Sequence, residues 1–330
     1  MNYQNIPGTD LNPSVICLGT GAMGGGGIKD GLSAEILDRY LEAGGNFIDT
    51  AHCYSDWIPG ERSRSEKFLG RWFRERGNRD KVVLSTKGAH PSFDAMHIPR
   101  MTRQEVESDL NSSLSLLGVD CVDIYWVHRD DRSRPVEEIL TMLDDFRRAG
   151  KIRHAGFSNW RLDRVELARK AAAEMSLPGF VASQNQWSLG QADGSKGDPT
   201  WAYVDDPFIN WHREHHFAAV PYTSQANGYF RRLERGTVDQ ASNLVLGLFH
   251  HAENQQRFAR LQNVQKDTGY SVSQIVLGYL ISQAFPVFPI VGPKNEPDLD
   301  DALRATEAKL TPEQVDYLHR GRSSLQPDAL

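Results

Sequence analysis

The chain has few cysteines, no long apolar run and no excess of basic residues. Its three cysteines, Cys17, Cys53 and Cys121, have spacings that match neither a disulfide framework nor a zinc motif. No apolar stretch approaches the roughly 18 residues that a bilayer span requires. A net charge of −6 argues against a nucleic-acid or membrane surface. The N-terminus lacks the basic and then apolar pattern of a signal peptide, so we expect a cytoplasmic protein.

What the sequence does contain is a regular alternation of strand and helix patterns. Short apolar runs predict buried strands, and segments with apolar periodicity and capping residues predict helices between them. Thr102 and Glu105, for example, have the spacing of a capping box. The predicted strands are 15–18, 46–49, 81–86, 122–127, 152–157, 180–184, 217–222 and 287–291. The predicted helices include 63–73, 161–173, 206–215, 254–268, 271–283, 297–306 and 312–321, and others open at Ser33, Thr102 and Pro135.

This order of elements predicts a (β/α)8 barrel, an α/β fold. Roughly eight β/α units in 330 residues favour a closed barrel over an open sheet. Residues 1–14 indicate an N-terminal β-hairpin or plug ahead of the first strand. The polar insert 187–204 and the irregular stretch 223–252 predict long loops at the C-terminal face. Because no linker or low-complexity segment interrupts the pattern, we predict a single domain over residues 1–330.

Polar side chains stand where several of the predicted strands end. Strand 46–49 ends in Asp49, with Tyr54 shortly after it. Strand 81–86 is followed by Lys87, and strand 122–127 by His128. In a parallel α/β protein the carboxyl ends of the strands share one edge, and ligands bind there. We therefore expect these four side chains to converge on one pocket.

Together the four groups suit proton transfer at a carbonyl or alcohol oxygen. A phenol such as Tyr54 is a poor acid at neutral pH, with an unperturbed pKa of about 10. A buried ammonium from Lys87 beside it would favour the phenolate and so lower that pKa. Asp49 would keep the lysine charged, and His128 could orient a substrate oxygen or relay a proton. Each residue alone has a structural explanation, but the ordered set indicates a catalytic site.

Two other motifs are weaker than they look. Residues 19–24 match G-x-G-x-x-G after a strand, which by pattern alone is a dinucleotide fingerprint. In that fingerprint the third glycine lies at the start of a helix, whereas here Gly25–Gly27 intervene and the helix is expected near Ser33. We favour a loop at the barrel mouth. His128-Arg129-Asp130 imitates a kinase catalytic loop but lacks its downstream Asn.

Several short segments, spread over nearly the whole chain, match one family in order. They are Ile16–Thr20, Phe47–Tyr54, Ser65–Gly70, Ser85–Lys87, Asp123–His128, Gly156–Asn159, Gln184, Pro221–Ser224 and Gly292–Lys294. In these segments the sequence resembles the aldo-keto reductase superfamily, and the Asp-Tyr-Lys-His tetrad of that family is complete. The resemblance implies a (β/α) barrel that binds NADPH across its mouth without a Rossmann domain.

The resemblance also implies roles for individual residues. Tyr54 would be the general acid, Lys87 and Asp49 its tuning pair, and His128 the orienting group. Tyr222 matches the aromatic residue that stacks on the nicotinamide ring. The other cofactor-binding positions that it implies are Ser158, Asn159 and Gln184 at the carboxamide, Thr223 and Gln225 at the pyrophosphate, Lys294 near the 2′-phosphate, and Gly19, Thr20, Gly292, Asp298 and Asp301.

Departures from the family pattern concern the cofactor and the substrate. Lys294, a point cation, suits a phosphate and favours NADP. An acid at Asp298, where Gln or Arg is common, weakens that preference, so NAD stays the alternative. Ala302 stands where an adenine-contacting Asn is common. Residues 55–62 differ from the short tract usual after the tyrosine, which leaves the substrate open.

The leading hypothesis is an NADPH-dependent carbonyl reductase, with hydride from nicotinamide C4 and the proton from Tyr54. Its substrate would be a small aldehyde or ketone. The polar loop 187–204 and the tryptophans suggest a sugar or keto-sugar. Met23, Trp57 and Trp160 are the candidate substrate residues, with core packing as their alternative.

Two other functions compete with this one. The protein could be a non-catalytic nicotinamide-binding subunit or sensor, or a lyase or isomerase with a Schiff base at Lys87. We expect no metal site, because His215–His216 and His250–His251 lack ligand spacing. Cys53 is assigned no chemistry, because a pleated strand end would point it away from Tyr54. A homo-oligomer is left open.

Overall fold

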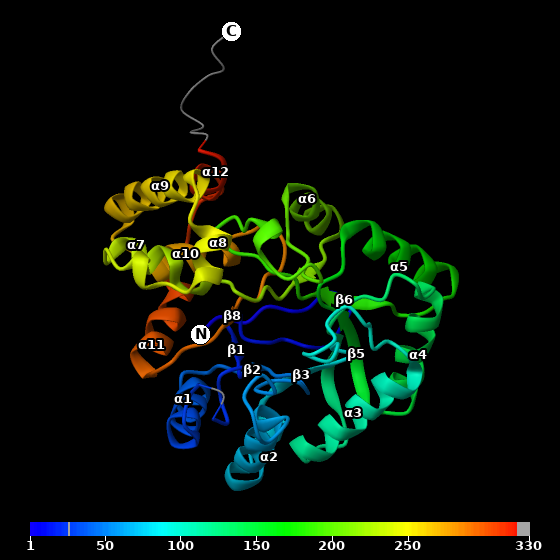
Figure 1. Ribbon diagram of the computed structural model, residues 1–330. Coiled ribbons are helices and arrows are strands. Elements are labelled where there is room, and N and C mark those ends of the chain that lie inside the picture. The colour runs from blue at the N-terminus through cyan, green and yellow to red at the C-terminus, as the bar shows by residue number, and fades with distance from the viewer. Residues whose placement is uncertain (26, 322–330) are drawn as a thin grey trace.

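The computed structural model describes residues 1–25 and 27–321. Its eight strands form one parallel sheet in the order β7-β6-β5-β4-β3-β2-β1-β8. A parallel bridge between Ala219 of β7 and Val287, three residues before β8, joins the two ends of that order. The sheet therefore curls into the predicted (β/α)8 barrel (Figure 1). The strands are β1 (Cys17–Gly19), β2 (Phe47–Asp49), β3 (Val83–Gly88), β4 (Val122–Val127), β5 (Ile152–Phe157), β6 (Phe180–Ser183), β7 (Ala218–Ala219) and β8 (Ile290–Val291).

Helices alternate with the strands along the chain. Figure 1 shows α1 to α5 following one another around the outside of the sheet, while α7 to α10 and α12 gather together beyond it. None of the helices within residues 1–25 and 27–321 has the length and apolarity that a membrane span requires. The helices are α1 (Asp30–Glu42), α2 (Arg64–Arg76), α3 (Arg103–Leu117), α4 (Val136–Arg148), α5 (Leu162–Glu174), α6 (Asp206–His215), α7 (Tyr229–Glu234), α8 (Asn243–Phe249), α9 (Ala252–Thr268), α10 (Val272–Ile281), α11 (Glu296–Arg304) and α12 (Pro312–Arg320).

The structure differs from the sequence prediction in a few elements. β7 and β8 are shorter than the predicted 217–222 and 287–291, and prolines at 221, 286 and 289 explain this because they have no N–H to donate to a ladder. The stretch 223–252, expected to be irregular, contains α7 and α8. Ser33 does not cap α1, which begins at Asp30; its hydroxyl is buried inside the first turns. The capping box of Thr102 and Glu105 is present.

Alternate residues of the strands fill the inside of the barrel. Side chains of a strand point to opposite faces in turn, so Phe47, Ile124 and Trp126 face inward while their neighbours face the helices. The N-terminal segment turns back on itself through a Tyr3–Ser14 bridge and adds Ile6 and Leu11 to this inner core. The hairpin therefore plugs the barrel.

Gly156 shows how tightly the inside of the barrel is filled. It lies opposite Trp126 in the ladder between β4 and β5. A Cβ atom at Gly156 would lie 2.2 Å from the Trp126 ring. The absence of a side chain at Gly156 therefore leaves the space that the Trp126 indole occupies. Trp126 lies two residues before His128, on the same face of the strand.

Candidate active site

The strand period delivers three of the four predicted catalytic side chains to one end of the barrel. Asp49 follows Phe47 on the inner face of β2, and His128 follows Trp126 just beyond β4. Ser85 pairs with Asp49 in the ladder, and Lys87 is the next inward residue of β3. The fourth side chain comes from a loop, because the backbone N–H of Tyr54 donates to the carbonyl of Ala51 (3.1 Å) in a tight turn after β2.

Lys87 lies at the centre of a buried hydrogen-bond chain. Its ammonium donates to Asp49 Oδ2 (2.5 Å), to the carbonyl of Thr50 (2.7 Å) and to the Tyr54 hydroxyl (2.9 Å). An ammonium has three donors, so all of them are used and the group is held in place. Asp49 Oδ1 accepts from Ser85 Oγ (2.7 Å) and Gln184 Nε2 (2.9 Å). Asp49 and Lys87 are both almost fully buried.

Electrostatics keep this lysine charged. Burial by itself lowers the pKa of Lys87, but the Asp49 carboxylate, followed by the Tyr54 hydroxyl, outweighs burial, and the net pKa is raised. An amine that stays protonated and ion-paired at neutral pH is a poor nucleophile. The geometry therefore disfavours the Schiff-base alternative.

Tyr54 is a protonated phenol at neutral pH. Burial raises the pKa of Tyr54 to about 12, and Lys87 acts in the opposite direction without cancelling that effect. The expectation that the ammonium would bring this pKa below its ordinary value was wrong, because the loss of water around the phenolate outweighs one nearby positive charge. The group therefore carries the proton that a general acid needs, although burial makes it a weaker acid than a free phenol.

His128 stands beside the phenol without bonding to it. The two ring centroids are 6.2 Å apart and the rings are nearly perpendicular, at 72°. All four side chains thus converge on one pocket, but hydrogen bonds join only Asp49, Lys87 and Tyr54. Burial, with His90 and Arg129 acting in the same direction, lowers the pKa of His128 well below its usual range. The imidazole is neutral at pH 7.

Cys53 faces the site, contrary to the expectation from strand pleating. Its sulfur lies 3.7 Å from His128 Nδ1. Residues 52–57 form turns rather than a continued strand, so the alternation of faces stops before Cys53. Both Cys53 and its neighbour Tyr54 consequently point toward the end of β4.

Four residues implied by the family resemblance to bind nicotinamide gather next to His128. Asn159, in the left-handed region with φ +61°, donates to the carbonyl of His128 (3.2 Å) and accepts from the Tyr222 hydroxyl (2.7 Å). The Ser158 hydroxyl donates to the carbonyl of Gln184 (2.7 Å). The ends of β4 to β7 are therefore tied together here. The side-chain amide of Gln184 already donates to Asp49, which the sequence did not indicate.

The backbone after β7 contains several residues with left-handed φ values. Thr223, Ala226 and Asn227 all have left-handed φ values within two consecutive turns. Turns of this kind present successive backbone N–H groups on one concave side, where phosphates bind. Gln225 lies between them and is half-buried. This is the segment that the family resemblance assigns to the pyrophosphate of the cofactor.

Both acidic residues that the resemblance places at the cofactor, Asp298 and Asp301, have partners in the structure. Asp298 forms an ion pair with Arg231 (2.9 Å), so its charge is compensated. Asp301 accepts from Ser271 Oγ (3.0 Å) and thus holds α11 to the start of α10. Lys294 is exposed near the start of α11, and Gly292 is exposed two residues before it. Arg231 was missed by the sequence analysis, because it lies 67 residues away from Asp298 along the chain.

At β1, the two predicted residues have packing roles in the structure. A Cβ atom at Gly19 would lie 2.6 Å from the side chain of Ile290 on β8. The Thr20 hydroxyl donates to the carbonyl of Asp49 (3.1 Å) and accepts from Ser65 Oγ (2.8 Å). Both residues therefore hold β1 against its neighbours at the mouth.

Of the three predicted substrate residues, two are in the core. Met23 and Trp160 are fully buried, and Trp160 packs between Phe157 and Phe180. Neither has surface to offer a substrate, so their assignment is corrected to core packing. Trp57 is half exposed and lies edge-on to Tyr54, with ring centroids 6.2 Å apart. Trp57 is the one of the three that the structure places beside the tetrad.

Two further rings, of Phe93 and His90, lie next to Trp57 and were missed by the sequence analysis. Phe93 packs edge-on against Trp57 (6.2 Å between centroids) and lies 4.9 Å from the His90 ring. His90 in turn lies 4.7 Å from His128. These loop residues follow no strand or helix period, so no sequence signal pointed to them. The rings form a continuous arc beside the Tyr54 hydroxyl.

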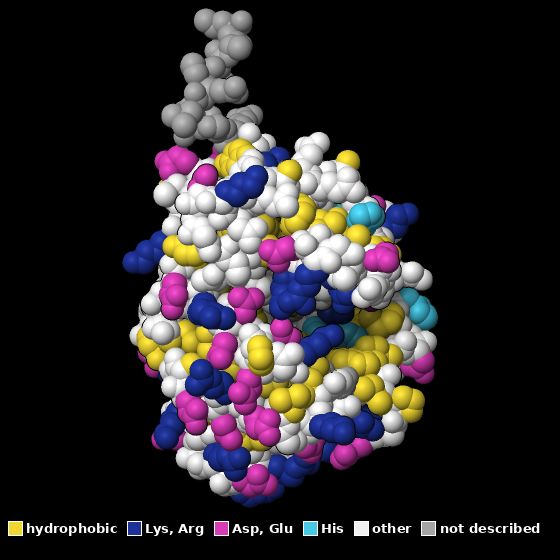
Figure 2. Space-filling view, turned by 90° about the vertical axis from the view of Figure 1, so that its left-hand side faces the viewer, with side chains coloured by type: hydrophobic (Ala, Val, Ile, Leu, Met, Phe, Trp, Pro, Cys, Tyr) yellow, Lys and Arg dark blue, Asp and Glu magenta, His cyan; other side chains and the backbone are white. Residues whose placement is uncertain are grey.

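The buried Arg129 is a further group that the sequence analysis did not assign. Its guanidinium donates to Thr200 Oγ1 (2.9 Å) in the 187–204 loop and to the carbonyl of His128 (2.9 Å). No carboxylate of the described residues lies within ion-pair distance of it. Figure 2 shows lysine, arginine and histidine side chains gathered at a hollow of the face in view, next to hydrophobic surface. The predicted loop thus closes over the end of β4.

Comparison with known proteins agrees with this geometry. The model of a family described as the aldo/keto reductase family matches residues 15–321. Norsolorinic acid reductase stcV of Emericella nidulans is 27% identical over 96% of this chain and 80% of its own length. Aryl-alcohol dehydrogenase [NADP(+)] of Phanerodontia chrysosporium is 29% identical over 96% of this chain and 84% of its own. A thermostable aldo-keto reductase, Tm1743, solved with the inhibitor epalrestat, has a TM-score of 0.70 at 22% identity, covering 97% of this chain and 99% of its own, and shows the fold.

Proposed function

The chain belongs to the aldo/keto reductase family, and we propose that it catalyses the NADPH-dependent reduction of an aldehyde or ketone to the alcohol. One observation carries this proposal. The buried chain from Asp49 through Lys87 ends on the protonated hydroxyl of Tyr54, beside a neutral His128. Such a chain suits a general acid that gives one proton to a developing alkoxide.

The residues of the mouth would hold the cofactor. Ser158, Asn159 and Gln184 offer amide and hydroxyl groups for the nicotinamide carboxamide, and Tyr222 offers an aromatic face. When bound, the reduced nicotinamide supplies the hydride that the carbonyl carbon accepts. Arg231, on the helix that follows the turns at 223–228, and Lys294, just before α11, are the cations that would contact the phosphates of the cofactor. Because Arg231 compensates Asp298, we favour NADPH over NADH.

The proton comes from the Tyr54 hydroxyl. As the substrate oxygen gains negative charge, Tyr54 transfers its proton to that oxygen. The ammonium of Lys87, 2.9 Å away, then stabilises the phenolate that forms. Asp49 keeps the ammonium charged and aimed, because its second oxygen is held by Ser85 and Gln184. His128 would donate a ring N–H to the same substrate oxygen and so fix its position.

The arc of aromatic rings favours an aromatic carbonyl compound as the substrate. Trp57 and Phe93 offer ring faces and edges to a flat, apolar molecule next to Tyr54. The sugar or keto-sugar predicted from the sequence keeps the polar loop 187–204 as support but loses Trp160, which is buried. A panel of aromatic aldehydes and aldoses, assayed with both NADPH and NADH, separates these substrates and cofactors.

Tyr54→Phe is the decisive variant for this function. It removes only the hydroxyl that gives the proton, so turnover should fall by roughly 10²- to 10⁴-fold while NADPH binding is kept. Tyr270→Phe is the matched control, since its exposed hydroxyl donates to the carbonyl of Glu307 far along the chain. NADPH oxidation followed by absorbance measures turnover, and a cofactor titration measures binding. Full turnover in Tyr54→Phe would contradict the proposal.

The same assay distinguishes a reductase from a non-catalytic cofactor-binding protein. A wild-type protein that binds NADPH tightly but oxidises it with no member of the panel would be a cofactor-binding subunit or sensor. The intact tetrad supports turnover instead. The single domain over residues 1–330, the cytoplasmic location and the oligomeric state stay predictions from the sequence.

A further inference from the structure

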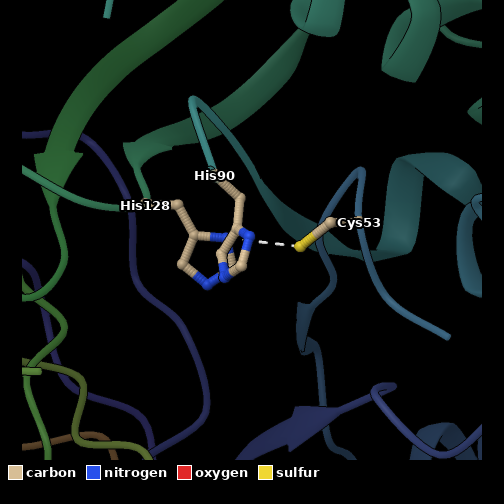
Figure 3. Close-up of side chains that lie close together, drawn as sticks. All are labelled: Cys53, His90 and His128. Atoms are coloured by element: carbon tan, nitrogen blue, oxygen red, sulfur yellow. Dashed lines mark hydrogen bonds between the residues drawn. The ribbon is translucent and has the colours of Figure 1, made fainter. Parts of the chain in front are cut away.

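Three metal-ligand side chains meet beside the catalytic tetrad. They are Cys53 from the turn after β2, His90 from the loop after β3 and His128 from the end of β4. One ligand atom of each lies within 4.8 Å of the other two, and Figure 3 shows the thiol and both imidazoles directed at one another. The sequence analysis considered only adjacent histidine pairs and so could not find this set.

The separations fit a shared cation. Cys53 Sγ and His128 Nδ1 are 3.7 Å apart. Two ligands of a tetrahedral zinc ion, with Zn–S near 2.3 Å and Zn–N near 2.0–2.1 Å, lie about 3.6 Å from each other. The pair therefore needs almost no rearrangement to bind one ion.

One ring nitrogen of His90 is hydrogen-bonded to a backbone carbonyl, as is usual for histidines that bind metals. Its Nδ1 lies 2.7 Å from the carbonyl oxygen of Pro91. A carbonyl only accepts, so Nδ1 carries the proton and Nε2 keeps the lone pair. Histidine ligands of metals almost always donate their second N–H to a carbonyl or carboxylate in this way.

Protonation states favour the two imidazoles as ligands. A neutral imidazole binds a metal through its unprotonated nitrogen, which for His90 is Nε2. Because the thiolate of Cys53 is the ligand, its proton must pass to solvent when the metal binds, and affinity should rise with pH.

An ion can reach two of the three ligands through a cavity, and side chains of both charges surround them. Cys53 and His90 line a cavity of about 670 Å³ whose wall also carries acidic side chains (Asp56, Asp94, Asp109) and basic ones (Arg62, Lys67, Arg100). Lys87 and Arg129 lie near His128 and oppose a cation, but Asp49 compensates Lys87. The thiolate formed on binding adds a negative charge against the remaining guanidinium.

We propose that Cys53, His90 and His128 bind a borderline or soft divalent cation, with Zn²⁺ as the best match, and that this ion inhibits the enzyme. Two imidazoles and one thiolate leave the fourth tetrahedral position to water. An ion on His128 Nδ1 fixes the orientation of the ring and, with its bound water, competes with the substrate for the space beside Tyr54. The binding part is independent of the proposed function, and only the inhibition rests on it.

Zinc titration of the purified full chain tests the binding. Competition with a chromophoric chelator should give one ion per chain, and Co²⁺ in its place should give the charge-transfer absorption of a thiolate ligand. Cys53→Ala and His90→Ala should each weaken Zn²⁺ binding by more than the roughly 10- to 100-fold that loss of an outer-shell partner causes. Cys121→Ala and His97→Ala are the matched controls elsewhere on the chain and should bind as wild type does.

The outcomes are distinct. Unchanged Zn²⁺ affinity in both Cys53→Ala and His90→Ala, each shown to be folded by circular dichroism, would overturn the site, as would absence of stoichiometric binding to wild type. Zn²⁺ should also inhibit NADPH oxidation reversibly, and His90→Ala should lose that sensitivity relative to its own activity. Binding without inhibition would overturn the link to His128. Failure of the proposed function would instead show as no turnover in metal-free protein.

Discussion

Lys87→Met tests the buried ion pair that organises the proposed active site. Methionine has a similar length but no donors and no charge. The change leaves Asp49, which has no exposed surface, without its positive partner. Breaking a buried pair by removing one partner typically costs about 3–5 kcal/mol. Asp49 keeps the donors of Ser85 and Gln184, so we expect the lower end, about 3 kcal/mol.

The double variant Asp49→Asn/Lys87→Met shows where that loss comes from. If the cost is an uncompensated charge, removing both charges should return the unfolding free energy to within about 1 kcal/mol of wild type. Urea unfolding at about pH 7 of wild type, both single variants and the double variant measures the coupling. Turnover should stay lost in the double variant, because no ammonium is left to stabilise the Tyr54 phenolate.

Two results would refute this reasoning. A single Lys87→Met variant that unfolds within about 1 kcal/mol of wild type would mean that Asp49 is not a buried charge in need of its partner. A double variant that regains turnover would mean that the pair serves only the fold. Cofactor titration of each variant controls for loss of NADPH binding.

Three further predictions follow from single positions. Burial raises the pKa of Glu66 from 4.5 to about 7. The free energy of unfolding of wild type should therefore fall by about 3 kcal/mol as pH rises from about 4.5 to about 7. Glu66→Gln should remove this loss, which unfolding curves at about pH 5 and about pH 8 measure. An equal gap between wild type and variant at both pH values would contradict it. Lys294→Met should raise the KM for NADPH about tenfold, as loss of one charge-assisted contact implies, and leave the KM for NADH unchanged; equal effects on both cofactors would contradict a 2′-phosphate contact. Gly156→Ala should lower stability by about 1–3 kcal/mol in thermal melts because of the Trp126 ring, and a neutral effect would mean that the ring moves freely.

The barrel could be predicted because buried parallel strands leave a strong trace in a sequence. The run at β4, for example, is buried on both faces, and the prediction of 122–127 agrees with the observed strand. The weak points were β7 and β8, where prolines end the ladder after two residues each. Helices α7 and α8 are short and lie in a stretch without clear periodicity, so tertiary packing rather than local pattern determines them.

The candidate site was predictable to the extent that it lies on strand ends. Asp49, Lys87 and His128 each continue the inward face of a strand, so the two-residue period places them together. Trp160 was misplaced, because a large aromatic side chain three residues past the end of β5 can turn either to the mouth or to the core. His90 and Phe93 lie on a loop with no period, and their position depends on contacts that only the folded chain has.

The turn at residues 51–54 explains why proton donor and proposed metal ligand share one place. In an extended strand two neighbouring residues point to opposite faces, so Cys53 and Tyr54 could not both reach the end of β4. The hydrogen bond from Tyr54 N–H to the carbonyl of Ala51 ends the strand geometry, and both side chains then point to the barrel mouth. The hydroxyl of Tyr54 reaches Lys87, while the thiol of Cys53 reaches His128. An ion held by this thiol would therefore lie beside the proposed proton donor, and the proposed inhibition rests on this turn.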